Sequence, residues 1–130
     1  MVNEKVIVAG FGGQGVMLMG QVLSYCATEK NINTLWFPSY GPETRGGTAN
    51  CSVTISEKSV NSPVISTPDS IIIMNKPSLA KFMPKLKKDG NLFVNTSLVV
   101  DFLPLVVGKA SNSFLPNFLF VLWYKDFLPK

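Results

Sequence analysis

A glycine-rich loop near the start of the chain combines residues that could bind an anion: Gly10, Gly12, Gly13, Gln14 and Gly15. Glycines let the backbone turn tightly and approach a ligand, and a helix that starts here supplies N–H donors and positive potential. The spacing matches the G-x-G-x-x-G pattern of dinucleotide-binding loops. That pattern also needs an acid at the end of the next strand, where this sequence has Trp36 and Phe37. A P-loop would need Lys and Ser or Thr where Val16 and Met17 stand.

NAD, FAD and P-loop nucleotides are therefore disfavoured, and two interpretations of the loop stay open. It is a tight strand-to-helix turn, or it presents backbone N–H groups and the Gln14 amide to a ligand or to a partner's cofactor. Four glycines within six residues are more than a turn needs, which favours the second interpretation.

A second loop follows the next predicted strand and carries a further set of candidates: Ser39, Tyr40, Gly41, Glu43, Arg45, Gly46 and Gly47. A guanidinium fork matches a phosphate or a carboxylate, so Arg45 is a candidate anion ligand. The alternative is an exposed ion pair between Glu43 and Arg45, which would contribute little stability. Loops after parallel strands gather at the carboxyl edge of a sheet, so we expect the two loops to be neighbours.

Hydrophobic periodicity predicts the elements that position these loops. Strands are expected at 5–9, 34–37 (ended by Pro38), 50–56, 64–66, 70–74 and 91–95, and helices at 16–30 and 77–88, the latter shortened or kinked by Pro84. Strands that alternate with helices imply βαβ crossovers. The predicted fold is a three-layer, Rossmann-like α/β domain with a mainly parallel sheet and helices on both faces.

The predicted helix at 16–30 is unusual because its only charges are Glu29 and Lys30, at its end. A surface helix normally carries a charged face, so we expect this one to be covered on more than one side. The lysines of 76–88 are expected to form a solvated face, with steering of an acidic partner as the alternative.

Composition excludes several functions. The chain has 130 residues, enough for one domain, with 46% hydrophobic and 15% charged residues. The absence of histidine excludes histidine-based triads and histidine metal sites within this chain. Two cysteines are too few for an iron–sulfur cluster, and both are expected to be reduced and buried.

Partners and compartment follow from charge and hydropathy. A net charge of +4 is well short of a nucleic-acid-binding signature. No apolar run approaches the ~18 residues of a membrane span, and the N-terminus lacks the features of a signal peptide. These features predict a cytoplasmic protein that binds neither nucleic acid nor a membrane.

Two motifs at one spacing make the sequence recognisable. IVAGFGGQGV, followed by PSYGPETRGGTANCSVTIS, resembles the gamma subunit of the 2-oxoacid:ferredoxin oxidoreductases, the pyruvate/ketoisovalerate oxidoreductase catalytic-domain family. TPDSIIIMNKPSL and KKDGNLFVNTSLV are also similar to that family, and the 2-oxoglutarate and 2-oxoisovalerate types look closest. The beta subunit of indolepyruvate oxidoreductase is a near relative. The resemblance covers roughly residues 4–99.

The resemblance implies a subunit that is inactive alone. Such enzymes convert a 2-oxoacid, coenzyme A and oxidised ferredoxin to acyl-CoA, CO2 and reduced ferredoxin. Thiamine diphosphate, Mg and iron–sulfur clusters sit on partner subunits (alpha, beta and delta), and coenzyme A is a co-substrate. By position, the two glycine-rich loops face the shared site, Arg45 points to coenzyme A phosphates or the substrate carboxylate, and Glu43 orients Arg45. Asn75, at the end of a buried strand, is a third candidate.

The C-terminal segment departs from the family pattern. We expect a gamma-subunit domain at 1–100 and an atypical hydrophobic segment at 101–130 that packs on the same domain, with a homodimer of the isolated chain as the other way to cover the sheet. The competing functions are a stand-alone module that binds coenzyme A or a nucleotide, and a purely structural interaction domain.

Overall fold

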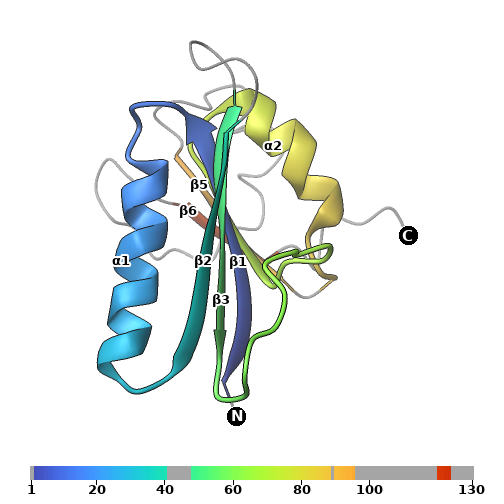
Figure 1. Ribbon diagram of the computed structural model, residues 1–130. Helices are drawn as coiled ribbons and strands as arrows, with labels where there is room; N and C mark the ends of the chain where they lie inside the picture. Colours follow the sequence, from blue (N-terminus) through green and yellow to red (C-terminus); the bar gives the residue numbers. More distant parts are fainter. Residues whose placement is uncertain (1, 41–47, 89, 96–119, 124–130) are drawn as a thin grey trace.

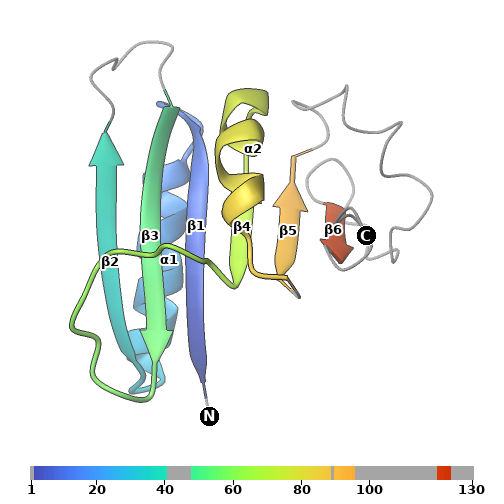
Figure 2. The same cartoon turned by 90° about the vertical axis from the view of Figure 1, so that its right-hand side faces the viewer.

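The computed structural model describes residues 2–40, 48–88, 90–95 and 120–123. The helices and strands follow one another as β1 (Asn3–Phe11), α1 (Val16–Glu29), β2 (Asn33–Tyr40), β3 (Thr48–Ser56), β4 (Ser70–Ile73), α2 (Lys76–Phe82), the 3-10 turn η1 (Met83–Lys85), β5 (Asn91–Val94) and β6 (Phe120–Trp123). Within these ranges, six strands form one sheet in the order β2-β3-β1-β4-β5-β6 (Figure 2).

Four of the six strands (β1, β2, β4 and β5) run in the same direction, as a mainly parallel sheet requires, and β3 and β6 run the opposite way. β1 pairs in parallel with β4, and β4 with β5. β3 lies antiparallel between β1 and β2, and β6 runs antiparallel to β5. Both predicted crossovers exist, because β1 and β2 run the same way and α2 joins two adjacent parallel strands. β3 runs the opposite way because it returns directly from β2 and inserts between the two strands that α1 connects.

Helices cover both faces of the sheet, so the predicted three-layer arrangement is confirmed (Figure 1). On one face, α1 packs over a cluster of buried residues that includes Val8, Cys51 and Val53. On the other face, α2 and η1 pack over Ile71, Ile73 and Leu92 with their neighbours. Burial of these aliphatic side chains is the main source of stability at each face.

β3 presents its two faces differently. Cys51 and Val53 point to α1 and are fully buried. On the opposite face, the strand carries only polar residues: Asn50, Ser52, Thr54 and Ser56. The segment 57–69, named here the crossing segment, leaves β3, passes over this polar face and reaches β4 (Figure 2). On this face, α2 lies over β4 and β1. β3 is crossed instead by the crossing segment, which is not a helix (Figure 2).

Two prolines fit the structure in different ways. The prediction that Pro38 ends the second strand is wrong, since β2 continues to Tyr40. β2 is the outermost strand next to β3, and an edge strand tolerates the missing N–H of proline. Pro84 does shorten the second helix, which ends at Phe82 and passes into η1.

Three further expectations concern residues 64–66, the two cysteines and the C-terminal segment. Residues 64–66 form no strand but part of the crossing segment. Cys51 is buried as expected, whereas Cys26 is exposed, because it lies on the outer side of α1. Within 101–130, Phe120–Trp123 adds β6 to the sheet edge, and the rest of that segment lies outside the described residues.

Candidate ligand-binding edge of the sheet

The glycine-rich loop and the two ends of the second loop lie at one end of the sheet, named here the carboxyl edge. β1 ends at Phe11, whose register partner is Thr48, the first residue of β3. Tyr40, the last residue of β2, pairs with Ala49. Both ends of the second loop are therefore at the same end of the sheet as the glycine-rich loop. Gly41, Glu43, Arg45, Gly46 and Gly47 lie outside the described residues, as does the side chain of Tyr40, and Ser39 is exposed near the end of β2.

Gln14 fastens the glycine-rich loop to the sheet. Its Oε1 accepts a hydrogen bond from the N–H of Phe11 at 2.7 Å, and its Nε2 donates to the carbonyl of Met74 at 3.3 Å. Gln14 N–H also donates to the Phe11 carbonyl at 3.3 Å, which closes the turn. The amide that the sequence assigned to a ligand is turned inward, so its observed role is to position the loop.

The glycines of this loop are required for two different reasons. At Gly10, an added Cβ would lie 2.7 Å from both Gln14 Oε1 and Met74 Cβ and 2.9 Å from Val16 Cγ2, so there is no room for a side chain. Gly13 and Gly15 have open space around them but positive φ values of 90° and 78°. That backbone region disfavours residues with a Cβ.

The glycine-rich loop places the N-terminus of α1 at the carboxyl edge. Gly15 is the N-cap and supplies no side chain to cap the first turn, and no acidic residue lies in that turn. The first N–H groups of a helix lack intrahelical acceptors and carry a partial positive charge. Gly12, Gly13 and Gly15 are exposed, so this end of α1 is open to an anionic group.

Asn75 joins the same edge from β4. The register pairs Ile73 with Ala9, and the N–H of Met74 donates to the Ala9 carbonyl at 2.9 Å. Asn75 is only 2% exposed, and its Oδ1 caps α2 by accepting from the N–H of Ser78 at 2.9 Å. Its Nδ2 and the hydroxyl of Ser78 are buried without hydrogen-bond partners among the described residues.

The structure adds contributors that the sequence did not indicate. Met74 supplies only its carbonyl, and Ser78 a buried hydroxyl. A backbone carbonyl leaves no signal in a sequence. Asn75 fits the N-cap pattern, but the third residue after it is Ser78 and not the Glu or Gln of a capping box, so the role of Ser78 had no signal either.

One ionisable group below α1 is perturbed by its surroundings. Burial is the largest influence on the Cys51 thiol and raises its pKa above the ordinary value. The thiol donates to the Val16 carbonyl at 3.4 Å. Cys51 is therefore an inert core residue that supports the first turn of α1.

The described residues contain neither a candidate metal site nor a helix suited to span a membrane. No group of three or more Cys, Asp or Glu side chains within them could hold a metal ion. None of the helices within them is long and apolar enough to cross a membrane.

A sheet covered on both faces by helices, with a glycine-rich loop leading into an uncapped helix at its carboxyl edge, defines a Rossmann-like α/β unit. Comparison with known proteins identifies which one. The chain belongs to the pyruvate ferredoxin/flavodoxin oxidoreductase family, whose sequence profile matches residues 5–121. The resemblance found in the sequence is thus confirmed.

Individual relatives agree with that assignment. The chain is 44% identical over 93 residues to the ketoisovalerate oxidoreductase subunit VorA of Methanothermobacter marburgensis, covering 72% of this chain and 20% of VorA. It is 38% identical over 101 residues to the 2-oxoglutarate synthase subunit KorC of Methanothermobacter thermautotrophicus, covering 77% of this chain and 53% of KorC.

Among solved structures, the gamma subunit of a keto/oxoacid ferredoxin oxidoreductase from Geobacter sulfurreducens superposes with a TM-score of 0.62 at 28% identity. That match covers 75% of this chain and 53% of the subunit. The chain therefore spans about half of two of these relatives and a fifth of the third.

Proposed function

We propose that this chain is the gamma-type unit of a thiamine-diphosphate-dependent 2-oxoacid:ferredoxin oxidoreductase and is inactive alone. The observation that carries the proposal is the meeting of Gly10–Gly15, the open N-terminus of α1 and both ends of the second loop at one edge. That edge provides N–H donors and positive potential but no base or nucleophile among the described residues. It suits a part that completes a site owned by another chain.

The residues at the carboxyl edge fit an anionic group and not a metal. N–H groups at the start of α1 are suited to a phosphate or carboxylate, as found in coenzyme A and in a 2-oxoacid. Among the described residues, no three or more Cys, Asp or Glu side chains gather where they could hold a metal ion, and we assign Mg and the iron–sulfur clusters to partner subunits. Thiamine diphosphate, when bound there, supplies the carbanion chemistry.

This chain's contribution is then to bind and orient. The loop held by Gln14 keeps the first turn of α1 in place, because both ends of the amide are anchored. Arg45, between the two ends of the second loop, would contribute a bidentate cation to the same anion. Asn75 would offer its unpartnered Nδ2 from the β4 side.

The outer side of α1 supports the role of a subunit. Leu18, Val22 and Tyr25 are 63%, 52% and 67% exposed, at the i, i+4 and i+7 positions that form one stripe. Together they make an apolar face on a helix whose sequence was expected to be covered on more than one side. We assign this face to contact with a partner subunit of the complex.

A second copy of this chain could also cover the apolar face of Leu18, Val22 and Tyr25, but that face is small for a homodimer interface. A stable interface between separate chains buries roughly 800 Å² per partner and engages about 20–30 residues a side. Three side chains fall short of that for either kind of partner, so further surfaces of the chain would have to take part in the contact. In VorA the matching region is one fifth of a longer chain.

The site is tested by Arg45→Ala in the complex reconstituted with its thiamine-binding and ferredoxin-type subunits. We expect a higher KM for coenzyme A or for the 2-oxoacid, with kcat changed less, because the lost guanidinium would act in binding. Lys30→Ala removes a cation at the opposite end of α1 and serves as the control. Unchanged kinetics for Arg45→Ala would remove Arg45 from the site.

The interface is tested separately by Val22→Lys, with Val64→Lys as the matched control. Both positions are exposed, at 52% and 76%, so both variants should fold. We expect Val22→Lys alone to reduce co-purification with the partner subunits. Calorimetric titration of the isolated chain distinguishes the other function: tight binding of NAD or coenzyme A without partners would favour a stand-alone module.

A further inference from the structure

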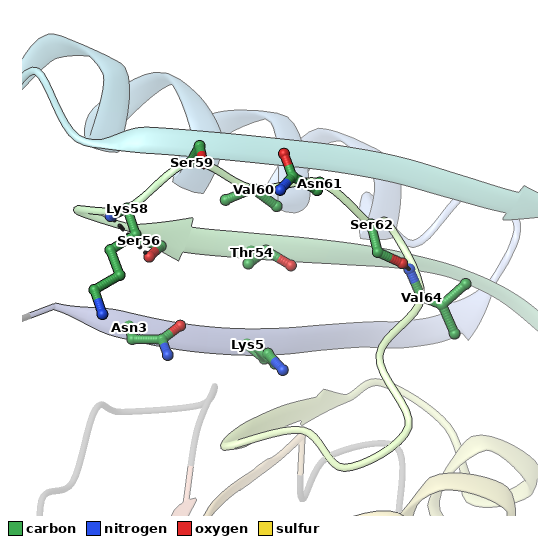
Figure 3. Close-up of a pocket in the computed structure, with 10 residues that line it drawn as sticks. All are labelled: Asn3, Lys5, Thr54, Ser56, Lys58, Ser59, Val60, Asn61, Ser62 and Val64. Carbon is green, nitrogen blue, oxygen red and sulfur yellow. Dashed lines mark hydrogen bonds between the residues drawn. The ribbon is translucent and has the colours of Figure 1, made fainter.

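A polar pocket lies between the sheet and the crossing segment, at the opposite end of the sheet from the carboxyl edge. Its volume is about 340 Å³, at the lower end of the range typical of small-molecule sites. β1 and β3 form its floor, and residues 58–64 of the crossing segment form its roof (Figure 3). Nothing in the proposed function uses it.

The floor of the pocket is polar where the same face is apolar further along. Lys5 pairs across the ladder with Thr54, and Asn3 with Ser56. Two residues on from Lys5, Ile7 belongs to the core under α2. Thr54 and Ser56 are 6% and 7% exposed, so their hydroxyls lie at the bottom of the pocket and are not general surface groups.

The hydroxyls differ in how much of their bonding capacity is used. Ser56 Oγ accepts from the N–H of Lys58 at 3.1 Å and so ties the start of the crossing segment to the floor. Ser62 Oγ accepts from the N–H of Val64 at 3.2 Å. Both keep their O–H donors, and Thr54 makes no side-chain hydrogen bond within the described residues, so three donors are available to an acceptor in the pocket.

The pocket carries an uncompensated positive charge. Lys5 enters it from β1 and Lys58 from the roof, and Figure 3 shows Lys58 reaching back toward Asn3. No Asp or Glu is among the ten residues that line it. The nearby Asp69 is occupied, because its carboxylate accepts from the N–H of Lys5 at 2.9 Å and pairs with Lys87 at 3.3 Å. Neither Lys5 nor Lys58 has an ion-pair partner in the described part of the chain.

We propose that this pocket binds an oxyanion, the phosphate or carboxylate group of a small ligand. The ammonium groups of Lys5 and Lys58, the hydroxyls of Thr54 and Ser56 and the amides of Asn3 and Asn61 all favour an anionic acceptor. An apolar ligand is disfavoured, since Val60 and Val64 are the only apolar residues among those that line the pocket.

The experiment titrates the full chain with inorganic phosphate, and separately with acetate, at constant ionic strength. Backbone amide chemical shifts report the binding. We expect saturable shifts confined to residues 3–5 and 54–64. The tighter of the two probes identifies whether a phosphate or a carboxylate is preferred.

Variants make the test specific. Lys5→Met and Lys58→Met should each weaken binding about fivefold, as expected for the loss of a charge about 4 Å from an anion in watery surroundings. Lys88→Met removes the same charge from an exposed position outside the pocket and should leave the affinity unchanged. Thr54→Val should weaken binding while preserving side-chain shape.

Two results would overturn the proposal. One is a titration with both probes that never saturates or that shifts amides all over the protein. The other is an equal loss of affinity in Lys88→Met and Lys58→Met, which would show a response to net charge alone. Both lysines of the pocket are exposed, so failure to fold is not expected to obscure the outcome.

Discussion

Replacing Gly10 by alanine tests whether the glycine-rich loop is built for close packing. The new Cβ would approach Gln14 Oε1, Met74 Cβ and Val16 Cγ2 to between 2.7 and 2.9 Å, and contacts of this kind force something to move. Val16 and Met74 are each 3% exposed, so they have little space to retreat. The amide of Gln14, which is only partly buried, is the group we expect to be displaced.

The expected cost follows from these contacts. Alanine in place of glycine within a strand would ordinarily stabilise by about 0.5–1 kcal/mol. Displacing Gln14 loses two hydrogen bonds, each contributing about 0.5–1.5 kcal/mol, and crowding Met74 and Val16 adds about 1–3 kcal/mol. Taken together, these terms lower the unfolding free energy of Gly10→Ala by about 1–5 kcal/mol, with a central value of about 3 kcal/mol.

Urea denaturation followed by circular dichroism measures this change, and a double-mutant cycle with Gln14→Ala identifies its cause. If the methyl group acts by expelling the Gln14 amide, the double variant should lose less stability than the sum of the single variants, by about 1 kcal/mol or more. A loss below about 0.5 kcal/mol for Gly10→Ala, or strict additivity in the cycle, would refute the reasoning.

Four further predictions concern α1 and its support. Gly15→Ala should lower the unfolding free energy by about 1 kcal/mol, because φ is 78° and only the backbone conformation, not a lack of space, opposes a side chain. Gly15→Asn should lower it by less. Thermal unfolding of the two variants measures both changes. Gly20→Ala should lower the unfolding free energy by about 1–2 kcal/mol, although alanine has the better helix propensity. The reason is that the new Cβ would overlap Cys51 Sγ and lie 2.8 Å from Trp36 Nε1. Adding Cys51→Ala to this variant should recover part of the lost stability. Burial raises the pKa of Cys51 above 9.0, so the thiol loses its proton at a lower pH in the unfolded state than in the folded state. The unfolding free energy should therefore fall above about pH 9. This fall should be smaller in Cys51→Ala. Thiol titration should label the exposed Cys26 in the native protein and Cys51 only after unfolding.

Local patterns in the sequence predicted most elements correctly. The predicted helix at 16–30 is α1 at Val16–Glu29, because its apolar positions recur at the helical period. The apolar run SIIIM became β4, with Ile71 and Ile73 fully buried. Such features depend on neighbours within a few residues, which a single sequence displays.

The missed features depend on partners that are distant in the chain. The alternation of 50–56 indicated a strand but not its direction, because apolar and polar faces alternate equally in parallel and antiparallel pairing. Gln14 was expected to face a ligand, whereas its amide bonds to a carbonyl 60 residues away. The polar face of β3 was visible as serines and threonines, but the pocket appears only where the crossing segment passes over it.

The insertion of β3 between β1 and β2 has an evolutionary consequence. Eight register pairs join β2 to β3, so the stretch 41–47 is a hairpin connection with both ends fixed in the ladder. Insertions, deletions and exchanges are accommodated most readily in such connections. Sequence changes between Tyr40 and Thr48 therefore leave the β2–β3 ladder intact, and under the proposed function they would change ligand contacts without altering the framework of the sheet.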